Sequence, residues 1–427
     1  MKYLKLNCMF AGIVMVLLAA SCAPATPAVV EKEVVVEKPV VETVVVEKEV
    51  VVEKLVVETV IVEKEKIVAA KPIKIGFVSD FSGMWATNEV PTRDGARFAV
   101  DEINAAGGVQ GQPLVLIVRD GQDDPALTVR LIEELIREGV VYIIGTVGDS
   151  IVSTCHVACE ADIPISTGIG SAPTLVEDGG ECCFTVIFND PVQASVAAKY
   201  AYDQGYRTAF MMRSHEFPYV EDLPTYFQES FEHYGGEVIG EDEFRSEAGD
   251  YSAIVTTIAG LPELPDVIYT PMICPDSNVF MRQLRAAGME TPVIGPDTDD
   301  NPVLLDAGEA VEGFVFTTSG FPVEGTPLGD FYDRYEAVTG KRPDCIFYAL
   351  GYDEIYAVKQ AIETAGSAEP GAIMEAMRHL KDFKGITGTW SMDPETRRAE
   401  KGITIVKVEN NTFTYVDQFY PEFVPEP

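Results

Sequence analysis

The chain has 427 residues, of which 47% are hydrophobic, and its 32 basic residues against 68 acidic ones give a formal net charge of −36. Hydrophobic content of this size excludes a wholly disordered chain and allows one or two domains with a real core. So negative a charge excludes proteins that bind nucleic acid or anionic lipid surfaces through basic patches.

The first 21 residues are typical of an export signal. Lys2 and Lys5 precede an apolar run over 9–20, and small residues lead up to Cys22. This order predicts a bacterial lipoprotein signal peptide, 1–21, with Cys22 as the lipidated first residue of the exported chain; an ordinary secretory peptide with an incidental cysteine is the alternative. Loss of the two lysines takes the net charge to −38. We expect a protein that is lipid-anchored to the outer face of the cytoplasmic membrane, in the periplasm or at the cell surface.

Residues 22–71 predict a tether. From Val30 the sequence repeats with a period of sixteen, VEKEVVVEKPVVETVV and then VEKEVVVEKLVVETVI. The repeat matches neither a heptad nor strict alternation, valine disfavours a helix and Pro39 interrupts one. Glutamate and lysine at regular intervals counteract β-aggregation. We expect an extended spacer that lifts the body off a membrane, with an adhesive repeat as the alternative.

The body opens with a βαβ unit. Apolar strands over 73–78 and 113–118 flank a helix whose apolar residues recur with a period of 3.6 and which ends at the pair Gly107 and Gly108. Such units build parallel sheets, whose ligands bind beyond the carboxyl ends of the strands. The first candidate binding loop is therefore 79–90, which contains Trp85. A loop aromatic that covers the core is the alternative for this tryptophan.

Two more strands end in turns that carry hydroxyl groups. The strand over 140–144 leads to a helix with Asp149 or Ser150 as its expected cap, and the strand over 163–166 leads to Ser171, the expected cap of another helix. The first N–H groups of a helix can bind an anionic ligand group. A cap that only satisfies its helix is the alternative.

The cysteines predict disulfides. Setting aside Cys8 and Cys22 leaves six in the exported chain, an even number that suits oxidation. Four of them form two clusters, for which we expect pairing between the clusters: Cys155, Cys159, Cys182 and Cys183. A metal site that includes His156 is the alternative, and the connectivity stays open. Cys274 and Cys345 either pair with each other or stay free.

The alternation of strand and helix continues to the C-terminus. Strands are expected over 184–188, 209–212, 237–240, 266–269, 292–295 and 313–317, and helices over 192–204, 223–234, 252–259, 277–287, 328–339, 349–365 and 372–380. A hairpin-like end is expected from 389–392 and 403–413. These series predict an α/β fold with two doubly wound, parallel-sheet lobes. The four histidines lie in no HExxH or nucleophile-elbow motif and no GxGxxG loop is present, so we expect no enzyme, no catalytic residue, no cofactor and no metal.

The motifs, in their order and spacing, resemble the leucine/isoleucine/valine-binding family of type I periplasmic substrate-binding proteins. The motifs are IKIGFVSDFSG, DGARFAVDEINAAGGVQG, DDP, YIIG, SAPTL, MRQLRAAGM, GP and ALGYD, and the resemblance covers the chain from 73 to about 418. The resemblance implies two lobes that close on a ligand, joined by crossovers near 188, 317 and 390. The expected lobes are 72–188 with 318–390, and 189–317 with 391–427.

The resemblance also implies a binding site. In the family, a serine, a threonine and backbone N–H groups of the first lobe hold an α-carboxylate, and a carboxylate of the second lobe holds the ammonium group. Ser171 aligns with the threonine, Asp149 with the serine and Asp297 with the carboxylate. The expected ligand-binding residues are Trp85, Asp149, Ser150, Ile169, Ser171, Tyr219, Met272 and Asp297. The alternative for Asp297 is that it only belongs, with its neighbouring aspartates, to an acidic cluster at the start of a helix. For Tyr219, a place in the pocket wall and a place outside it are weighted equally.

Two positions depart from the family pattern. Met272 or Ile273 stands where the family has a tyrosine, and Asp149 stands in place of the serine. An ionised Asp149 at about 4 Å from a ligand carboxylate would cost several kcal/mol. Either Ser150 replaces it, or the ligand is not an ordinary α-amino acid.

The resemblance implies the binding component of an ABC importer, a monomer that delivers a branched-chain or other small amino acid to a membrane permease. Binding and closure would suffice for this task. The alternatives are a binder of an amide, urea-like or cationic solute, a ligand-sensing subunit of a receptor, and a purely structural surface protein.

Overall fold

A computed structural model describes residues 39–42, 54–57 and 70–426. The predicted signal peptide, Cys22 and most of the predicted tether lie outside these residues. The chain divides at Lys71 into two compact units, each described by itself.

Two short strands of the repeat are described. β1 (Pro39–Glu42) and β2 (Lys54–Val57) pair antiparallel, with Glu42 opposite Lys54 and Val40 opposite Val56. Their antiparallel pairing was not predicted, and the extended spacer remains a prediction.

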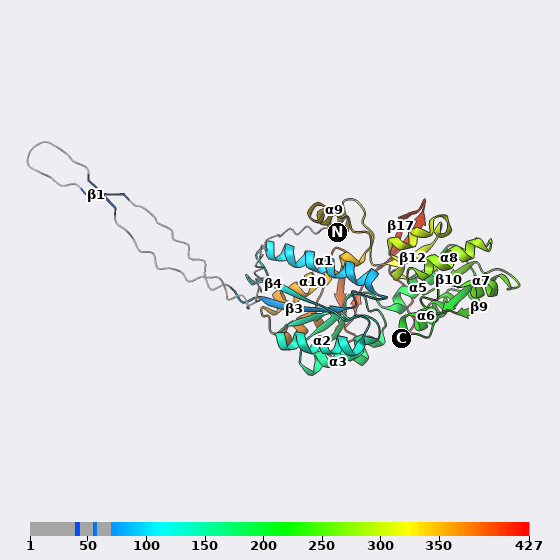
Figure 1. Ribbon diagram of the computed structural model, residues 1–427, viewed down its shortest axis with the longest axis horizontal. Coiled ribbons are helices and arrows are strands. Elements are labelled where there is room, and N and C mark those ends of the chain that lie inside the picture. Colours follow the sequence, from blue (N-terminus) through cyan, green and yellow to red (C-terminus); the bar gives the residue numbers. More distant parts are fainter. Residues whose placement is uncertain (1–38, 43–53, 58–69, 427) are drawn as a thin grey trace, which may run out of the picture. The chain divides into compact units, whose positions relative to one another are not determined.

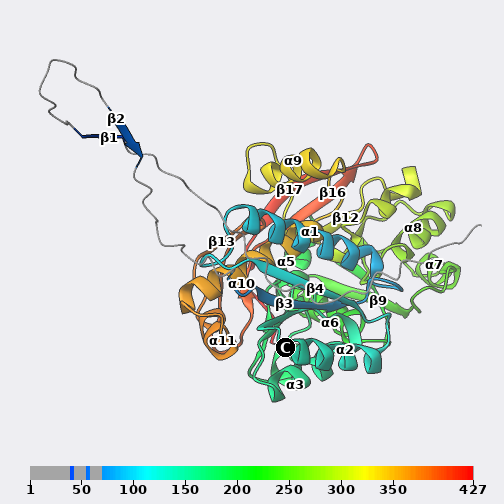
Figure 2. The ribbon, with the colours of Figure 1, turned by 60° about the vertical axis from the view of Figure 1, so that its left-hand side comes forward.

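The body, Pro72–Pro427, contains a first sheet of five parallel strands in the order β4-β3-β5-β6-β7. The strands are β3 (Ile73–Ser79), β4 (Leu114–Asp120), β5 (Tyr142–Ile144), β6 (Ile165–Thr167) and β7 (Cys183–Thr185). Helices α1 (Ala86–Ala105) and α10 (Phe347–Ala365) lie on one face, with α2 (Pro125–Glu138) and α3 (Ile151–Glu160) on the other (Figures 1 and 2). α9 (Pro327–Thr339) packs on α1 through the rings of Phe98 and Phe331. α4 (Thr174–Gly179) packs on α3, and α11 (Pro370–Arg378) packs on α10.

Local signals place most of these helices. α2 begins after Asp124, whose carboxylate accepts from the backbone N–H groups of Ala126 and Leu127, and ends at Gly139 with φ of 77°. α1 departs from the prediction, because it begins at Ala86 within the predicted binding loop. Pro91 lies in its second turn, so the helix loses one backbone bond there without ending.

The second sheet has seven strands in the order β17-β16-β12-β11-β10-β8-β9. They are β8 (Thr208–Arg213), β9 (Glu237–Glu243), β10 (Val267–Tyr269), β11 (Val293–Gly295), β12 (Val315–Thr318), β16 (Ile403–Glu409) and β17 (Thr412–Phe419). Along β8, Ala209 and Met211 join the core beneath α5 (Asp190–Asp203) and α6 (Pro218–His233). Phe210 and Met212 alternate with them and pack with α7 (Ser252–Ala259), α8 (Asp276–Ala286) and the 3₁₀ segment η3 (Pro302–Val311). This sheet is therefore also covered on both faces, and the predicted fold of two doubly wound sheets is confirmed.

The C-terminal hairpin differs from the prediction. β16 pairs with β17 through a turn at Asn410 and Asn411, both with positive φ, and β16 runs antiparallel to β12. Residues 388–392 instead form β14 (Gly388–Met392), which pairs with β13 (Phe383–Gly385) and β15 (Ala399–Glu400) in a separate small sheet. The adjacent Asn410 and Asn411 are a local hairpin signal that the prediction did not use.

The chain passes between the two large sheets three times. It leaves the first sheet after β7, returns after β12, and crosses again between β15 and β16. Arg398, just before β15, bridges Thr185 of β7, so this part of the chain stays beside the first sheet. The lobe boundaries remain a prediction.

Two disulfides join α3 to the segment around β7. Cys155 bonds Cys183 and Cys159 bonds Cys182, with Cα atoms 5.7 Å and 5.3 Å apart. The predicted pairing between the clusters is confirmed, and it leaves no thiol of the four for a metal. Within the described chain, Cys274 and Cys345 are free and buried.

None of the helices in the described residues is long and apolar enough to cross a membrane.

Candidate functional site

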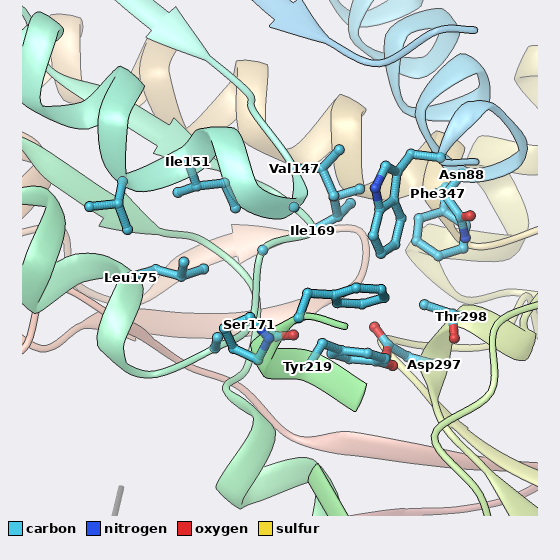
Figure 3. Close-up of a pocket in the computed structure, with 17 residues that line it drawn as sticks. Asn88, Val147, Ile151, Ile169, Ser171, Leu175, Tyr219, Asp297, Thr298 and Phe347 are labelled. Carbon is cyan, nitrogen blue, oxygen red and sulfur yellow. The ribbon is translucent and has the colours of Figure 1, made fainter. Parts of the chain in front are cut away.

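A cavity of about 200 Å³ lies beyond the carboxyl ends of strands from both sheets. Its wall comes from the loops that follow β3, β5, β6, β8 and β11 and from the first turn of α10 (Figure 3). The lining residues are Trp85, Asn88, Val147, Gly148, Ile151, Val152, Ile169, Gly170, Ser171, Ala172, Leu175, Phe217, Pro218, Tyr219, Asp297, Thr298 and Phe347. Most of them are apolar, four carry aromatic rings, and only a few polar groups interrupt the wall. This is the usual composition of a small-molecule site.

Two aromatic rings meet across the cavity. Trp85, from the loop after β3, packs edge-to-face on Phe217, from the loop after β8, with ring centroids 5.7 Å apart. Gly148 makes room for the indole, since a Cβ at this position would lie 3.2 Å from Nε1 of Trp85. The pair thus joins the halves built on the two sheets at the wall of the cavity.

Asp297 is the charged group of the cavity. It begins the 3₁₀ turn η2 (Asp297–Asp299) after β11 and is 4% exposed. The Tyr219 hydroxyl donates to its Oδ1 at 2.7 Å, as the adjacent side chains in Figure 3 show. Burial raises the pKa of Asp297 to about 6, although the Tyr219 hydrogen bond lowers it. A bound cation would favour the ionised form and would itself be stabilised by it.

A second carboxylate lies behind the cavity. Asp190, the first residue of α5, is fully buried, and neither of its carboxylate oxygens has a hydrogen-bond partner in the described part of the chain. Burial raises its pKa to about 8, and the charge of Asp297 adds to the rise. Gln193, one turn further along α5, accepts from the backbone N–H of Asp297 at 2.8 Å and from the Thr317 hydroxyl at 2.6 Å. The start of α5 therefore fixes Asp297 against the end of β12.

The opposite wall comes from the loops after β5 and β6. Gly170 allows these loops to touch, because a Cβ there would lie 2.7 Å from Cδ1 of Ile151. Ser171 follows at 4% exposure, and Ile169 is half-buried. A hydroxyl and backbone groups on this wall thus oppose the carboxylate on the other.

The Periplasmic binding protein family model matches residues 72–412. The chain belongs to this family. It is 25% identical to the leucine-, isoleucine-, valine-, threonine-, and alanine-binding protein of Pseudomonas aeruginosa over 330 residues, which cover 76% of this chain and 87% of the relative. The resemblance to the leucine/isoleucine/valine-binding family is confirmed.

Solved structures agree with this assignment. A leucine binding protein from Thermotoga maritima matches with a TM-score of 0.74 and 27% identity, covering 82% of this chain and 99% of that one. A branched-chain amino acid transporter substrate binding protein from Streptococcus pneumoniae, in complex with isoleucine, has the same fold, with a TM-score of 0.76, 24% identity and coverage of 82% and 100%.

In this member of the periplasmic binding proteins, five of the predicted site residues line one cavity: Trp85, Ile169, Ser171, Tyr219 and Asp297. Ser150 instead lines a neighbouring hollow that shares Trp85 and Phe217 with the cavity, and its hydroxyl donates to the Val147 carbonyl at 3.0 Å. Met272 lies away from the cavity, because its side chain is fully buried in the core under α7 and α8. The backbone of Asp149 lies in the 3₁₀ turn η1 (Gly148–Ser150), and its side chain lies outside what the structure describes.

The predicted helix caps differ from the structure. Ser150 stands at the N-cap of α3 without a side-chain cap bond, because its hydroxyl is directed back to Val147. Ser171 caps no helix, since α4 begins three residues later with Pro173 at its N-cap.

Several lining residues were not predicted. Asn88 lies one turn beyond Trp85, and the helix of which it is part was predicted to begin later. Phe217 and Thr298 are neighbours of predicted residues, so the ends of β8 and β11 carried the signal for them. Phe347 comes from the start of α10, far away in sequence, and no local pattern marks it.

Proposed function

We propose that this protein is the extracytoplasmic binding component of an ABC importer and that it captures a small amino acid in the cavity between its two halves. Family membership supports the class of function, and the names of its relatives support amino acids as the class of solute. The observation that carries the proposal is the buried Asp297, which faces a mostly apolar cavity with Ser171 on the opposite wall.

The two polar walls suit the two ends of an amino-acid head group. The ammonium group would bind Asp297, because an ion pair is much stronger in a buried site than in water. The α-carboxylate would bind the Ser171 hydroxyl and nearby backbone N–H groups. Apolar contacts with the aromatic rings and with Ile151 and Leu175 would hold the side chain.

We infer that the protein performs no chemistry on its solute. Capture followed by closure of the two halves and delivery to a permease needs only differential binding. We further infer that the protein is exported and anchored by a lipid on Cys22, with the repeat as a tether. The support is the order of charges, apolar run and small residues before Cys22.

A thermal-shift screen of the purified protein tests the proposal. A ligand that binds only the folded state raises the melting temperature in a concentration-dependent way. We expect at least one small amino acid to do so, and we expect Asp297→Asn to abolish the shift. Amides, ureas and polyamines belong in the same screen. A strong shift with one of these and none with any amino acid would contradict the proposal and favour the alternative ligand classes.

A further inference from the structure

Asn88 is a buried carboxamide in the cavity wall. It lies on α1, one turn after Trp85, and is 1% exposed. Its Oδ1 accepts from the Thr87 hydroxyl at 3.0 Å, while its Nδ2 has no hydrogen-bond partner within the described chain. If the amide oxygen and nitrogen were exchanged, one of them would still lack a partner, because the single hydroxyl of Thr87 reaches only one of the two atoms.

An unpaired amide atom is costly in such a place. A buried polar group without a partner costs about 1–3 kcal/mol. In Figure 3, Asn88 stands beside Phe347 at one end of the cavity, away from Leu175 and Ile151. Thr87 is bonded to Oδ1, and no other side chain of the described residues reaches Nδ2. A group that enters the cavity is therefore the available partner for the free amide atom.

The charge of the wall narrows the chemistry of that group. Asp297 is the acidic group of the wall, and among the described residues that line the cavity none is Lys, Arg or His. A ligand side chain with a carboxylate would therefore enter without a counter-charge, beside Asp297 and in front of Asp190. A hydroxyl or a carboxamide can both donate and accept, so it can pair with either end of the Asn88 amide.

We propose that Asn88 is a specificity-determining residue and that the preferred solute is an amino acid with an uncharged polar group, a hydroxyl or a carboxamide, bound to the Asn88 amide. This inference rests on the proposed function and deepens it by naming the class of side chain. A site that hydrogen-bonds a polar substrate group rejects the apolar isostere strongly, because the partner in the site is then left unpaired.

Calorimetry with two isosteric ligand pairs tests the inference. Asparagine has nearly the shape of leucine and threonine that of valine, so each pair differs mainly in polarity. For the purified wild-type protein we expect the polar member of at least one pair to bind tenfold or more tightly than its apolar partner. In Asn88→Leu the ratio should reverse, because the apolar side chain then pairs with apolar ligands.

Controls separate the possible results. Gln228→Leu makes the same kind of change on α6, outside the cavity, and should leave both ratios as in the wild type. If Asn88→Leu does not fold, Asn88→Ala replaces it as the test variant. The affinity ratios of the wild-type protein for the two ligand pairs decide the inference even without a variant. Leucine and valine binding at least as tightly as their polar isosteres would overturn this inference and leave the proposed function standing. Binding of no amino acid would overturn both.

Discussion

Single residues of the cavity are arranged for binding at a cost in stability. Asp297 and Asp190 are both buried, and each has a raised pKa. A carboxyl whose pKa is higher in the folded than in the unfolded chain takes up protons on folding. Such a carboxyl makes the free energy of unfolding fall as the pH rises from its pKa in the unfolded chain to its pKa in the folded protein. Above the folded-state pKa, the free energy of unfolding stays at this lower value.

This reasoning predicts that Asp297→Asn stabilises the protein at neutral pH. With a folded pKa of about 6 and an unfolded value of about 3.9, the stability of the variant relative to wild type should rise by about 2 kcal/mol from pH 4 to pH 7. Urea denaturation of both proteins across this range measures the difference. Tyr219→Phe is the control: it removes only the hydroxyl that bonds Asp297, so its pH dependence should persist. An equal free-energy difference between wild type and Asp297→Asn at pH 4 and pH 7 would contradict the prediction.

Residues of the cavity were predictable where they follow a strand. Ser171 stands in the loop after β6, Tyr219 in the first turn of the helix after β8 and Asp297 in the 3₁₀ turn after β11, and topology alone brings such strand ends together. Met272 follows β10 in the same way, but its side chain turns into the core, and neither periodicity nor loop position encodes that choice. Phe347 reaches the cavity only through the packing of α10 on α1, which is a long-range contact.

At the scale of elements, strict periodicity made most strands and helices predictable, while turn chemistry and the start of α1 were missed. The start of α1 was hidden because Pro91 is a residue that usually ends a helix. α3 is a different case, since its position depends on covalent bonds as well as packing. Cys155 and Cys159, on successive turns of α3, bond the adjacent Cys183 and Cys182, and the same helix begins at the cavity wall with Ile151.

Because two disulfides hold α3, we predict that their reduction strongly lowers the free energy of unfolding. The bonds span sequence separations of 28 and 23 residues, and closing a loop of this size stabilises a fold by about 3 kcal/mol in the chain-entropy model. Replacing all four cysteines with alanine should lower the free energy of unfolding by at least this amount, whereas replacing only Cys155 and Cys183 leaves the nested loop closed by Cys159 and Cys182 and should cost less. Chemical denaturation with and without reductant measures it. A variant that lacks all four cysteines should not respond to reductant, and a wild-type protein equally stable under both conditions would refute the prediction.

At the scale of the whole body, one buried cluster includes residues of both large sheets, and specific polar contacts add to it. The Asp300 carboxylate accepts from the Thr318 hydroxyl and from the backbone N–H of Ile346, so it ties the segment after β11 to the last residue of β12 and to the start of α10. Gln193 makes a comparable tie between α5 and Asp297. These bonds lie at the crossovers, whereas Trp85 and Phe217 meet at the cavity wall. If the halves open, as in hinge motion, the aromatic pair is the contact that separates.

That geometry predicts that the Trp85 and Phe217 pair contributes to ligand affinity by favouring the closed arrangement. The apparent dissociation constant rises when the binding-competent state is less populated. Trp85→Ala and Phe217→Ala should each weaken ligand binding. The loss of binding free energy in the double variant should be smaller than the sum of the two single losses. The difference should be about 1 kcal/mol, as is typical of an edge-to-face aromatic pair. Calorimetric titration of the four proteins with one ligand completes the double-mutant cycle.

A control comes from the Phe77 and Phe81 rings, which make a similar edge-to-face contact, 5.4 Å between centroids, but both belong to the half built on the first sheet. Phe81→Ala should therefore leave ligand affinity near the wild-type value, and strictly additive losses at Trp85 and Phe217 would show that the pair does not act through closure.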